Sequence, residues 1–252
     1  MLPEKNNGVI TADEQVAALQ AILAAHGQPA TDVLAGADAG CEPATGVTPQ
    51  TTEGPYYVSA DGARRQRTGI AQGRPGVPLQ LRITVVDADQ DAPVQGAEVD
   101  VWHCDALGYY SGHLAHDPDR LPTMNGSGHV PPTDASRFLR GAQCTDTDGT
   151  ADFDTIYPGW YFTRSIHIHL KVRVDGREVY TGQLYLPEEY NKAIEAFPPY
   201  NQHTTLERLP NADDLVYRSA GGKDLLLRVQ PVRPGHLQDG LIASFSVTVA
   251  PS

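Results

Sequence analysis

Two histidines, His167 and His169, stand two residues apart in a stretch of otherwise apolar sequence. Residues i and i+2 of a β-strand share one face, so both imidazoles would point the same way and could bind one metal ion. The spacing alone is a weak signal, because strand histidines are often no more than half-buried polar residues. Here Ile166, Ile168 and Leu170 predict a core strand, and a buried imidazole needs a polar partner, which a metal ion would provide.

Tyr161 lies six residues before His167, just after the turn predicted at Pro158-Gly159. A phenol must lose its proton to bind a metal, and its ordinary pKa is about 10. A trivalent cation favours that loss far more than a divalent one, so a set of tyrosine and histidine donors favours Fe(III). The alternative interpretation of Tyr161 is a core aromatic residue with a hydrogen-bonded hydroxyl group.

Short strands are the elements that must position these side chains. Apolar and polar residues alternate along 79–85 and again along 97–103, which is the pattern of half-buried strands. Further strands are predicted at 150–156, 166–175, 179–186, 223–230 and 241–249. Such strands, punctuated by 24 glycines and 20 prolines, are typical of an all-β fold. We therefore expect a β-sandwich of mixed topology with a few short helices and a short N-terminal helix.

Two helices are expected. Thr11 and Glu14 have the spacing of a capping box, which predicts a helix over 12–25. Its apolar positions at helical spacing are Val16, Leu19, Ile22 and Leu23. A helix of this length is not stable alone in water, so we expect it to pack on the main body or on a partner subunit. The second helix is predicted over 187–196, and residues 28–52 are predicted to form a connecting arm.

The 252 residues include 19 basic and 31 acidic side chains, for a formal net charge of −12. An acidic chain repels phosphate backbones, so a nucleic-acid partner is not expected. No apolar run approaches the ~18 residues that a membrane span needs, so no membrane partner is expected. No signal peptide is visible at the N-terminus, which predicts a cytoplasmic protein, or else an exported one whose signal has been removed.

Four ordered motifs carry a resemblance to a known family. They are Thr-Glu-Gly-Pro-Tyr-Tyr at 52–57, Trp-His-Cys-Asp-Ala-Leu-Gly-Tyr-Tyr at 102–110, Tyr-Pro-Gly-Trp-Tyr-Phe-Thr-Arg-Ser-Ile-His-Ile-His at 157–169 and Thr-Gly-Gln-Leu-Tyr at 181–185. In this order they resemble the intradiol ring-cleavage dioxygenases, in particular a less characterised bacterial and fungal branch. Members of this family are non-haem Fe(III) enzymes with a β-sandwich fold that split catechols between the two hydroxyl-bearing carbons.

The resemblance implies a set of four iron ligands. They are Tyr110, Tyr161, His167 and His169. Tyr109 is a rival for the place of Tyr110, because adjacent residues of a strand face opposite ways and only one of the two can point at the metal.

The resemblance also implies roles around the metal. Arg164 would lie beside the substrate and stabilise negative charge that develops there, the alternative being a surface ion pair. Gln183 would lie near the same place, and Tyr161 would leave the metal and help to take a proton. The residues implied to line the substrate pocket are Glu53, Gly54, Pro55, Tyr56 and Tyr109.

The implied function is the cleavage of a small aromatic diol with O2 to a cis,cis-muconate-type diacid. It would belong to a sandwich domain at 51–252, preceded by the helix and arm at 1–50. Cytosolic catechol dioxygenases use an extended helical N-terminal region to dimerise, and the chain departs from them because only one helix is expected here. A homodimer is nevertheless one expected partner state. Two alternatives stay open: an Fe(III)-dependent oxidation of another phenolic metabolite, and a transthyretin-like binding module without catalysis.

Other residues of chemical character have simpler interpretations. His103 and Cys104 follow a predicted strand and are expected to be buried core residues. The loop predicted at 111–137 carries three histidines, which we expect to be solvated rather than bound to a second metal. They are His113, His116 and His129.

Overall fold

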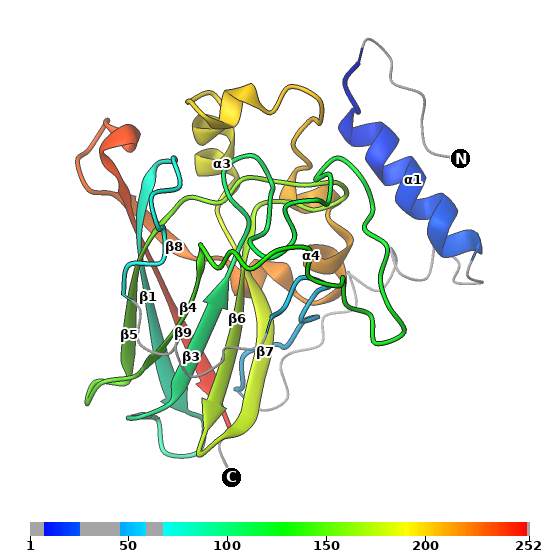
Figure 1. Cartoon of the computed structure of the whole chain (residues 1–252). Coiled ribbons are helices and arrows are strands. Elements are labelled where there is room, and N and C mark those ends of the chain that lie inside the picture. The colour runs from blue at the N-terminus through cyan, green and yellow to red at the C-terminus, as the bar shows by residue number, and fades with distance from the viewer. Residues whose placement is uncertain (1–7, 26–45, 59–67, 251–252) are drawn as a thin grey trace.

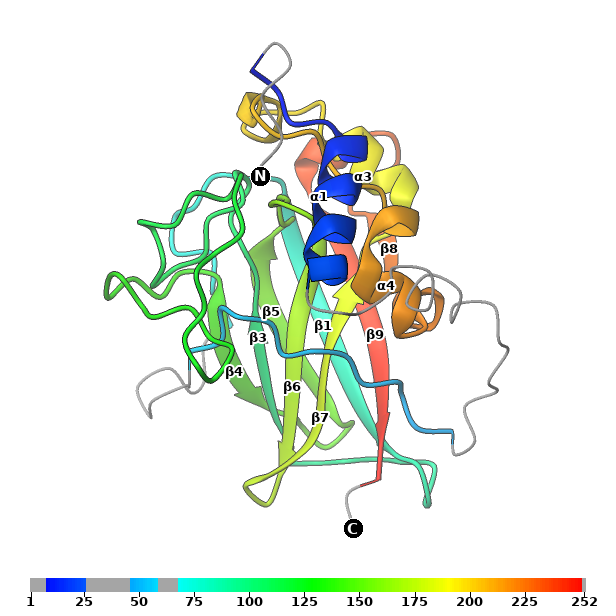
Figure 2. The same cartoon turned by 90° about the vertical axis from the view of Figure 1, so that its right-hand side faces the viewer.

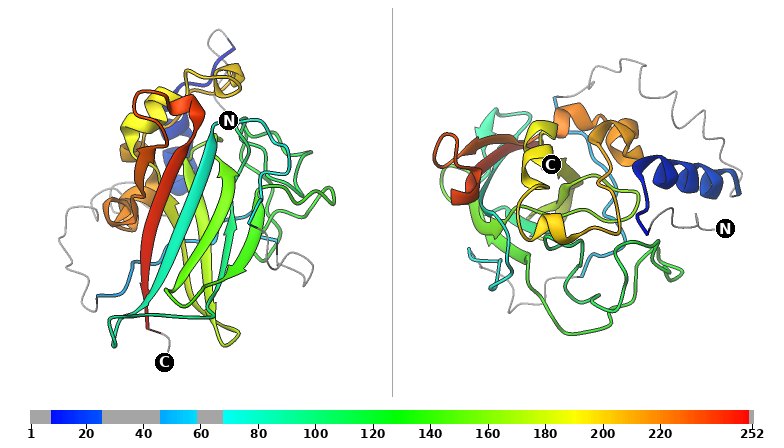
Figure 3. Two further views of the ribbon diagram at one scale, coloured as in Figure 1. Left: turned by 90° about the vertical axis from the view of Figure 1, so that its left-hand side faces the viewer. Right: turned by 90° about the horizontal axis from the view of Figure 1, so that it is seen from above.

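The computed structural model describes residues 8–25, 46–58 and 68–250, and it consists mainly of two sheets packed face to face (Figure 1 and Figure 3). Its strands are β1 (Pro78–Asp87), β2 (Ala92–Pro93), β3 (Glu98–Trp102), β4 (Arg140–Cys144), β5 (Thr150–Ile156), β6 (His167–Val174), β7 (Arg177–Tyr185), β8 (Arg228–Pro231) and β9 (Leu241–Val249). Its helices are α1 (Ala12–Ala25), α3 (Glu188–Ile194) and α4 (Leu215–Ser219). None of the helices in the described ranges is long and apolar enough to span a membrane.

The sheet that carries the histidine pair has the strand order β4–β3–β6–β7 and is antiparallel throughout. In the other sheet, β1 pairs antiparallel with β5 and β2 on one side and parallel with β9 on the other, and β8 continues the sheet beyond β9. The parallel pairing of β1 with β9 makes the topology mixed. The predicted all-β sandwich with a few short helices is therefore confirmed.

Strand β6 is buried on both faces: the second sheet packs on one face, and loop segments lie over the other. Ile168 and Leu170 point into the core between the two sheets. His167 and His169 point the other way, yet at most 2% of their surface is exposed. In Figure 2, residues 46–58 (light blue) cross in front of β6 and β7, and the loop between β3 and β4 (green) lies beside these strands. The outward face of β6 is thus buried from His167 to Lys171.

Helix α1 begins with the predicted capping box. The N–H of Thr11 donates to Oε2 of Glu14 at 2.8 Å, and the N–H of Glu14 donates to Oγ1 of Thr11 at 3.2 Å. Of the apolar positions named from the sequence, Val16, Leu19 and Ile22 are only half-buried, whereas Gln15 has no exposed surface. The polar side chain of Gln15 binds α1 to the rest of the protein, because its amide accepts the N–H of Thr163 and donates to the carbonyl oxygen of Glu207.

Some expectations from the sequence need correction. The strand predicted at 223–230 is a 3₁₀ turn (Gly222–Leu225) followed by β8. The turn starts after Gly221, whose φ of +68° is a left-handed conformation that a strand does not contain. Strand β4 is not predicted, because its Arg-Gly-Ala-Gln-Cys sequence lacks apolar alternation. The second helix is shorter than 187–196 at both ends. Of the predicted arm, residues 28–45 lie outside the described residues, and the rest contains no helix or strand.

A tight turn after β3 sets the place of Tyr110. Oδ1 of Asp105 accepts two backbone N–H groups within the turn, both at 3.0 Å. Gly108 has φ of +89°, in the left-handed region, and a Cβ atom there would lie 2.3 Å from the backbone oxygen of Trp160. Both the conformation and the available space therefore require glycine at this position.

We expect Gly108→Ala to lower the free energy of unfolding by about 3 kcal/mol, because the new methyl group must displace backbone and adopt a left-handed conformation. Gly128→Ala is the matched control, since its φ is +79° but a Cβ atom there meets nothing within 4 Å. The control should lose only the conformational contribution of about 1 kcal/mol. Urea unfolding followed by tryptophan fluorescence measures both, and equal losses would show that the close approach to Trp160 has no energetic effect.

Candidate metal centre

Four donor atoms meet above the outward face of β6. Oη of Tyr161 lies 3.1 Å from Nε2 of His167, and that nitrogen lies 3.1 Å from Nε2 of His169. Nε2 of His169 in turn lies 3.0 Å from Oη of Tyr110. All four side chains are buried, with at most 7% of their surface exposed. The structure thus brings together the four residues that the resemblance implies as ligands.

Strand pairing and close backbone contact fix the imidazole of His169. His169 lies opposite Trp102 of β3, and the two rings stack with centroids 4.9 Å apart and planes 8° apart. Gly54, with φ of +77°, approaches the same ring so closely that a Cβ atom would lie 2.8 Å from its Cε1. The imidazole is therefore held by an indole ring and by backbone that must be glycine.

Hydrogen bonding and burial set the protonation of the cluster. Nδ1 of His167 lies 2.7 Å from the carbonyl oxygen of Ser165, so Nδ1 carries the proton and Nε2 presents its lone pair to the cluster. Burial lowers the pKa of His167 to about 3, and that of His169 also falls well below its ordinary value. Burial raises the pKa of Tyr161 to about 12 and raises that of Tyr110 as well. Near pH 7, and without a cation, the cluster holds neutral imidazoles and protonated phenols.

This donor set fits a trivalent metal ion such as Fe(III). Among the described residues, no group of three or more His, Cys, Asp or Glu side chains could hold a metal, so a site here depends on the tyrosine hydroxyls. Metal–nitrogen bonds of about 2.0–2.1 Å put neighbouring donors about 3 Å apart around one ion, close to the separations between these four atoms. Two phenolates would offset two of the three charges of such an ion.

A buried carboxylate holds Arg164 beside Tyr161. Nε of Arg164 donates to Oδ2 of Asp214 at 3.0 Å, and Nη1 lies 3.5 Å from Oη of Tyr161. Nη2 donates to Oε1 of Gln183 and lies 3.5 Å from Oη of Tyr185. Burial opposes ionisation of Asp214, but the Arg164 guanidinium holds the pKa of this carboxyl below its ordinary value. The Asp214 side chain is fully buried and that of Arg164 is 12% exposed, so the pair lies mostly below the surface. One edge of the guanidinium faces the donor cluster.

Tyr110, and not Tyr109, contacts the histidine pair. The ring of Tyr110 stacks on Tyr56, with centroids 4.5 Å apart and planes 16° apart, so Tyr56 lies beside the cluster. Tyr109 is half-exposed, and burial together with nearby aspartates raises its pKa. The turn at Gly108 directs the two neighbouring phenols to different surroundings.

Glu53 and Pro55 fasten the segment that crosses β6, and they are not among the four donors. Glu53 forms an ion pair with Lys171, and its Oε2 lies 2.7 Å from Nε2 of His129 in the long loop. The carbonyl oxygen of Pro55 accepts the N–H of Val130 at 2.9 Å. These contacts tie the sheet, the crossing segment and the loop together over the site.

The structure agrees with the expectation for His103 and disagrees with it for His113. His103 is a satisfied core residue, because its ring nitrogens contact Oγ1 of Thr155 at 2.7 Å and the carbonyl oxygen of Cys104 at 2.8 Å. The expectation of a solvated side chain is wrong for His113, which is buried, and neither ring nitrogen has a hydrogen-bond partner in the described part of the chain. Its ring packs edge-on against Tyr56, with centroids 5.2 Å apart, because the loop folds back over the crossing segment.

Sequence reasoning missed three residues that support the site. Trp102 and Lys171 share the outward face with His169, which the alternation of the two strands could have indicated. Asp214 gives no such signal, because it lies 50 residues from Arg164 in the chain. Its local signature is that of the N-cap of α4, where Oδ1 accepts the N–H of Val216 at 2.8 Å.

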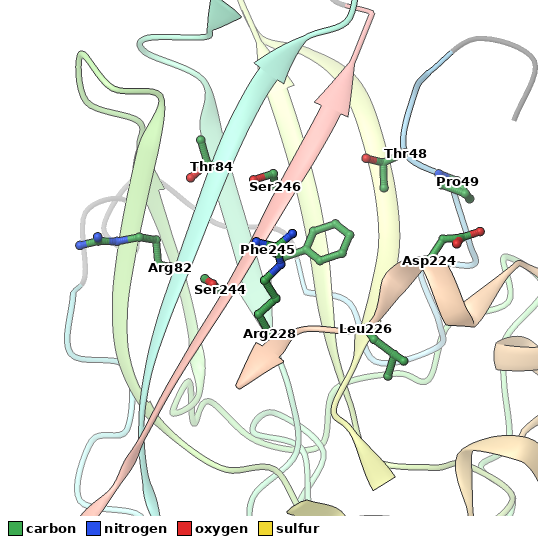
Figure 4. Close-up of a pocket in the computed structure, with 10 residues that line it drawn as sticks. All are labelled: Thr48, Pro49, Arg82, Thr84, Asp224, Leu226, Arg228, Ser244, Phe245 and Ser246. Carbon is green, nitrogen blue, oxygen red and sulfur yellow. The ribbon is translucent and has the colours of Figure 1, made fainter. Parts of the chain in front are cut away.

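A separate pocket of about 510 Å³ opens on the outer side of the other sheet (Figure 4). Its lining includes Arg82, Thr84, Arg228 and Ser244. None of the site residues named from the sequence lines it, so the donor cluster and this pocket are distinct.

Known proteins match the chain in both sequence and structure. Residues 52–195 match a family model described as dioxygenase. A catechol 1,2-dioxygenase of Acinetobacter lwoffii is 32% identical over 162 residues, which cover 55% of this chain and 46% of that protein. The chain therefore spans about half the length of the curated relatives it matches.

Two solved structures resemble this one over most of their length. An intradiol ring-cleavage dioxygenase from Tetranychus urticae is 31% identical, with a TM-score of 0.72 over 84% of this chain and 96% of that chain. The dioxygenase domain of a carbohydrate-binding fusion protein from Streptomyces sp. SirexAA-E is 27% identical, with a TM-score of 0.54 over 82% of this chain and 99% of that chain. Together with the ordered motifs, these matches show that the chain belongs to the intradiol ring-cleavage dioxygenase family.

Proposed function

We propose that this protein is an Fe(III)-dependent intradiol dioxygenase, which cleaves a catechol-type diol between its hydroxyl-bearing carbons to a cis,cis-muconate-type diacid. The observation that carries the proposal is the buried cluster of two imidazoles and two phenols with a guanidinium at its side. Tyr110, Tyr161, His167 and His169 would hold Fe(III), which would supply Lewis-acid chemistry for the reaction of the diol with O2. The chain itself supplies the donors, the proton acceptor and the charge that surround the diol.

Tyr161 is suited to take a proton from the substrate. Its Oη stands at one end of the row of donors and faces Arg164. Burial raises its pKa to about 12, so the phenolate is a strong base once it is no longer held by a cation. The nearby guanidinium lowers the cost of keeping that phenolate charged until the proton arrives.

Arg164 is suited to stabilise negative charge that develops on the substrate. Its guanidinium stays protonated, and it is oriented in advance by Asp214 and Gln183. A donor fixed in advance needs no reorganisation when the charge appears, and this is the source of most electrostatic stabilisation in active sites.

The surroundings of the cluster suit a flat aromatic ring. A small group of buried aromatic and apolar residues lies around the donors: Tyr56, Trp102, Cys104, Tyr110, Val130 and Tyr161. Such walls favour ring stacking, while the polar groups orient the hydroxyls. Two curated relatives are catechol 1,2-dioxygenases, so catechol is the first substrate to test.

The direct test is to incubate the iron-loaded protein with catechol and to follow O2 consumption together with the ultraviolet spectrum of the product. We expect O2 uptake equal to the amount of muconate formed, and visible absorption from tyrosinate-to-iron charge transfer. A colourless protein that binds catechol without consuming O2 would support the non-catalytic module instead. O2 uptake without a ring-opened product would support another oxidation of a phenol.

Tyr110→Phe should lose or shift the visible band and reduce iron content, because it removes the oxygen that lies 3.0 Å from His169. Tyr109→Phe is the matched control and should keep both the iron and the band, since its half-exposed phenol lies outside the cluster. Iron is measured by elemental analysis and the band by absorption. The opposite pattern would transfer the ligand role to Tyr109.

Arg164→Ala should lower turnover by about 100-fold at normal iron content, which corresponds to the ~3 kcal/mol that one well-placed donor contributes. Arg164→Lys should recover only part of this loss, because an ammonium group cannot contact Asp214 and Gln183 as a planar fork does. Arg233→Ala removes a comparable ion pair at the surface and should leave turnover unchanged. Turnover that falls only in proportion to lost iron would show that Arg164 is structural.

A further inference from the structure

A single turn of four residues carries both Tyr161 and Arg164. The N–H of Arg164 donates to the carbonyl oxygen of Tyr161 at 3.1 Å, and this hydrogen bond closes the turn. Within it, Thr163 has φ of +65°, in the left-handed region. A β-branched residue is disfavoured there, so contacts from the surroundings must hold the turn in this shape.

Separate parts of the chain supply these contacts. The N–H of Phe162 donates to the carbonyl oxygen of Pro118, in the long loop, at 2.8 Å. The N–H of Thr163 donates to Oε1 of Gln15, in α1, at 2.9 Å. Asp214 binds the residues that follow, through the Arg164 side chain and the backbone N–H of Ser165. The contact made by Gln15 is the one that acts on the left-handed residue itself.

Gln15 is built into the structure as a bridge. Its Nε2 donates to the carbonyl oxygen of Glu207 at 2.7 Å, so the amide joins the chain near Glu207 to the turn. The residues before α1 are fixed to the same segment, because the N–H of Glu207 donates to the carbonyl oxygen of Ile10 at 2.9 Å. Leu206 also accepts the indole N–H of Trp160 at 2.9 Å, next to the turn. The side chain of Gln15 is thus held by Thr163 and Glu207, and the backbone before α1 is held by the same Glu207.

We propose that Gln15 is a positioning residue of the active site: through it, α1 holds Thr163 in the left-handed conformation and so sets where Tyr161 and Arg164 stand relative to each other. This inference rests on the proposed function. Thr163 is buried, so without Gln15 its N–H would have no acceptor. The turn could then relax toward negative φ, which rotates the peptide that leads into Arg164.

Hydrogen exchange on the metal-free protein tests the contact without any activity measurement. Gln15→Met keeps the volume of the side chain and removes both hydrogen bonds. We expect the Thr163 amide to exchange at least tenfold faster in this variant, while amides of β6 keep their rates. Gln20→Met is the matched control, because Gln20 is exposed on the same helix and should change nothing. Unchanged exchange at Thr163 in Gln15→Met would overturn the proposal.

Turnover of catechol by the iron-loaded protein tests the consequence. Gln15→Met should lower kcat about 10- to 100-fold per bound iron, because small misplacements of catalytic groups have effects of this size. Gln15→Glu keeps an acceptor for the Thr163 N–H and should retain more turnover than Gln15→Met. Adding Thr163→Gly to Gln15→Met should restore most of the loss, since glycine adopts the left-handed conformation without support.

The outcomes separate this inference from the proposed function. A parent protein that holds iron but does not cleave catechol contradicts the proposed function. A parent that is active, with Gln15→Met equally active per iron, contradicts the role of Gln15 alone. A loss in Gln15→Met that Thr163→Gly does not restore would show that Gln15 acts only by docking α1, and this also overturns the proposal.

Discussion

The burial of two outward-pointing imidazoles on β6 is the constraint on which the rest of the site depends. Alternation along the strand directs His167 and His169 away from the core between the sheets, where a sandwich normally meets water. Both are nevertheless fully covered, and a buried ring nitrogen without a partner is costly. The phenols of Tyr161 and Tyr110 are polar partners for the Nε2 atoms of His167 and His169. Tyr110 comes from the loop that covers the sheet, and Tyr161 from the segment between β5 and β6.

The covering segments reach the histidines because their backbone can approach closely. Gly54 brings the crossing segment against His169, and Gly108 lets the turn before Tyr110 pack on the backbone of Trp160. Near these contacts, Lys171 on the outward face of the sheet forms an ion pair with Glu53 of the crossing segment. These contacts of Gly54, Gly108 and Glu53 lie close to the donor residues. The contacts that bury this face of the sheet therefore also fix the geometry of the cluster.

The sequence predicts those features of the fold and site that depend only on residues close together in the chain. The strands expected at 150–156 and 241–249 coincide with β5 and β9, because two-residue alternation is a local pattern. The pairing of His167 with His169 follows from the same rule. The contacts of Asp214 and Gln15 could not be predicted this way, since they join residues 50 and 148 positions apart. Nothing local marks Gln15 as more than one polar residue of a helix, and its importance comes from the unusual φ of Thr163.

Electrostatics explains why Asp214 belongs to the site although it touches none of the four donors. Near pH 7 the imidazoles and phenols are uncharged, so Arg164 would otherwise bring an uncompensated positive charge to within 3.5 Å of Tyr161. A cation entering the cluster would meet that charge in a poorly screened interior. Asp214 cancels it at the far side of the guanidinium, while Nη1 stays directed at the phenol. Release of two phenol protons can then offset most of a trivalent charge, which makes cation binding stronger as pH rises. The Arg164–Asp214 pair therefore lets a permanently charged guanidinium lie beside the donor cluster without opposing the entry of a cation there.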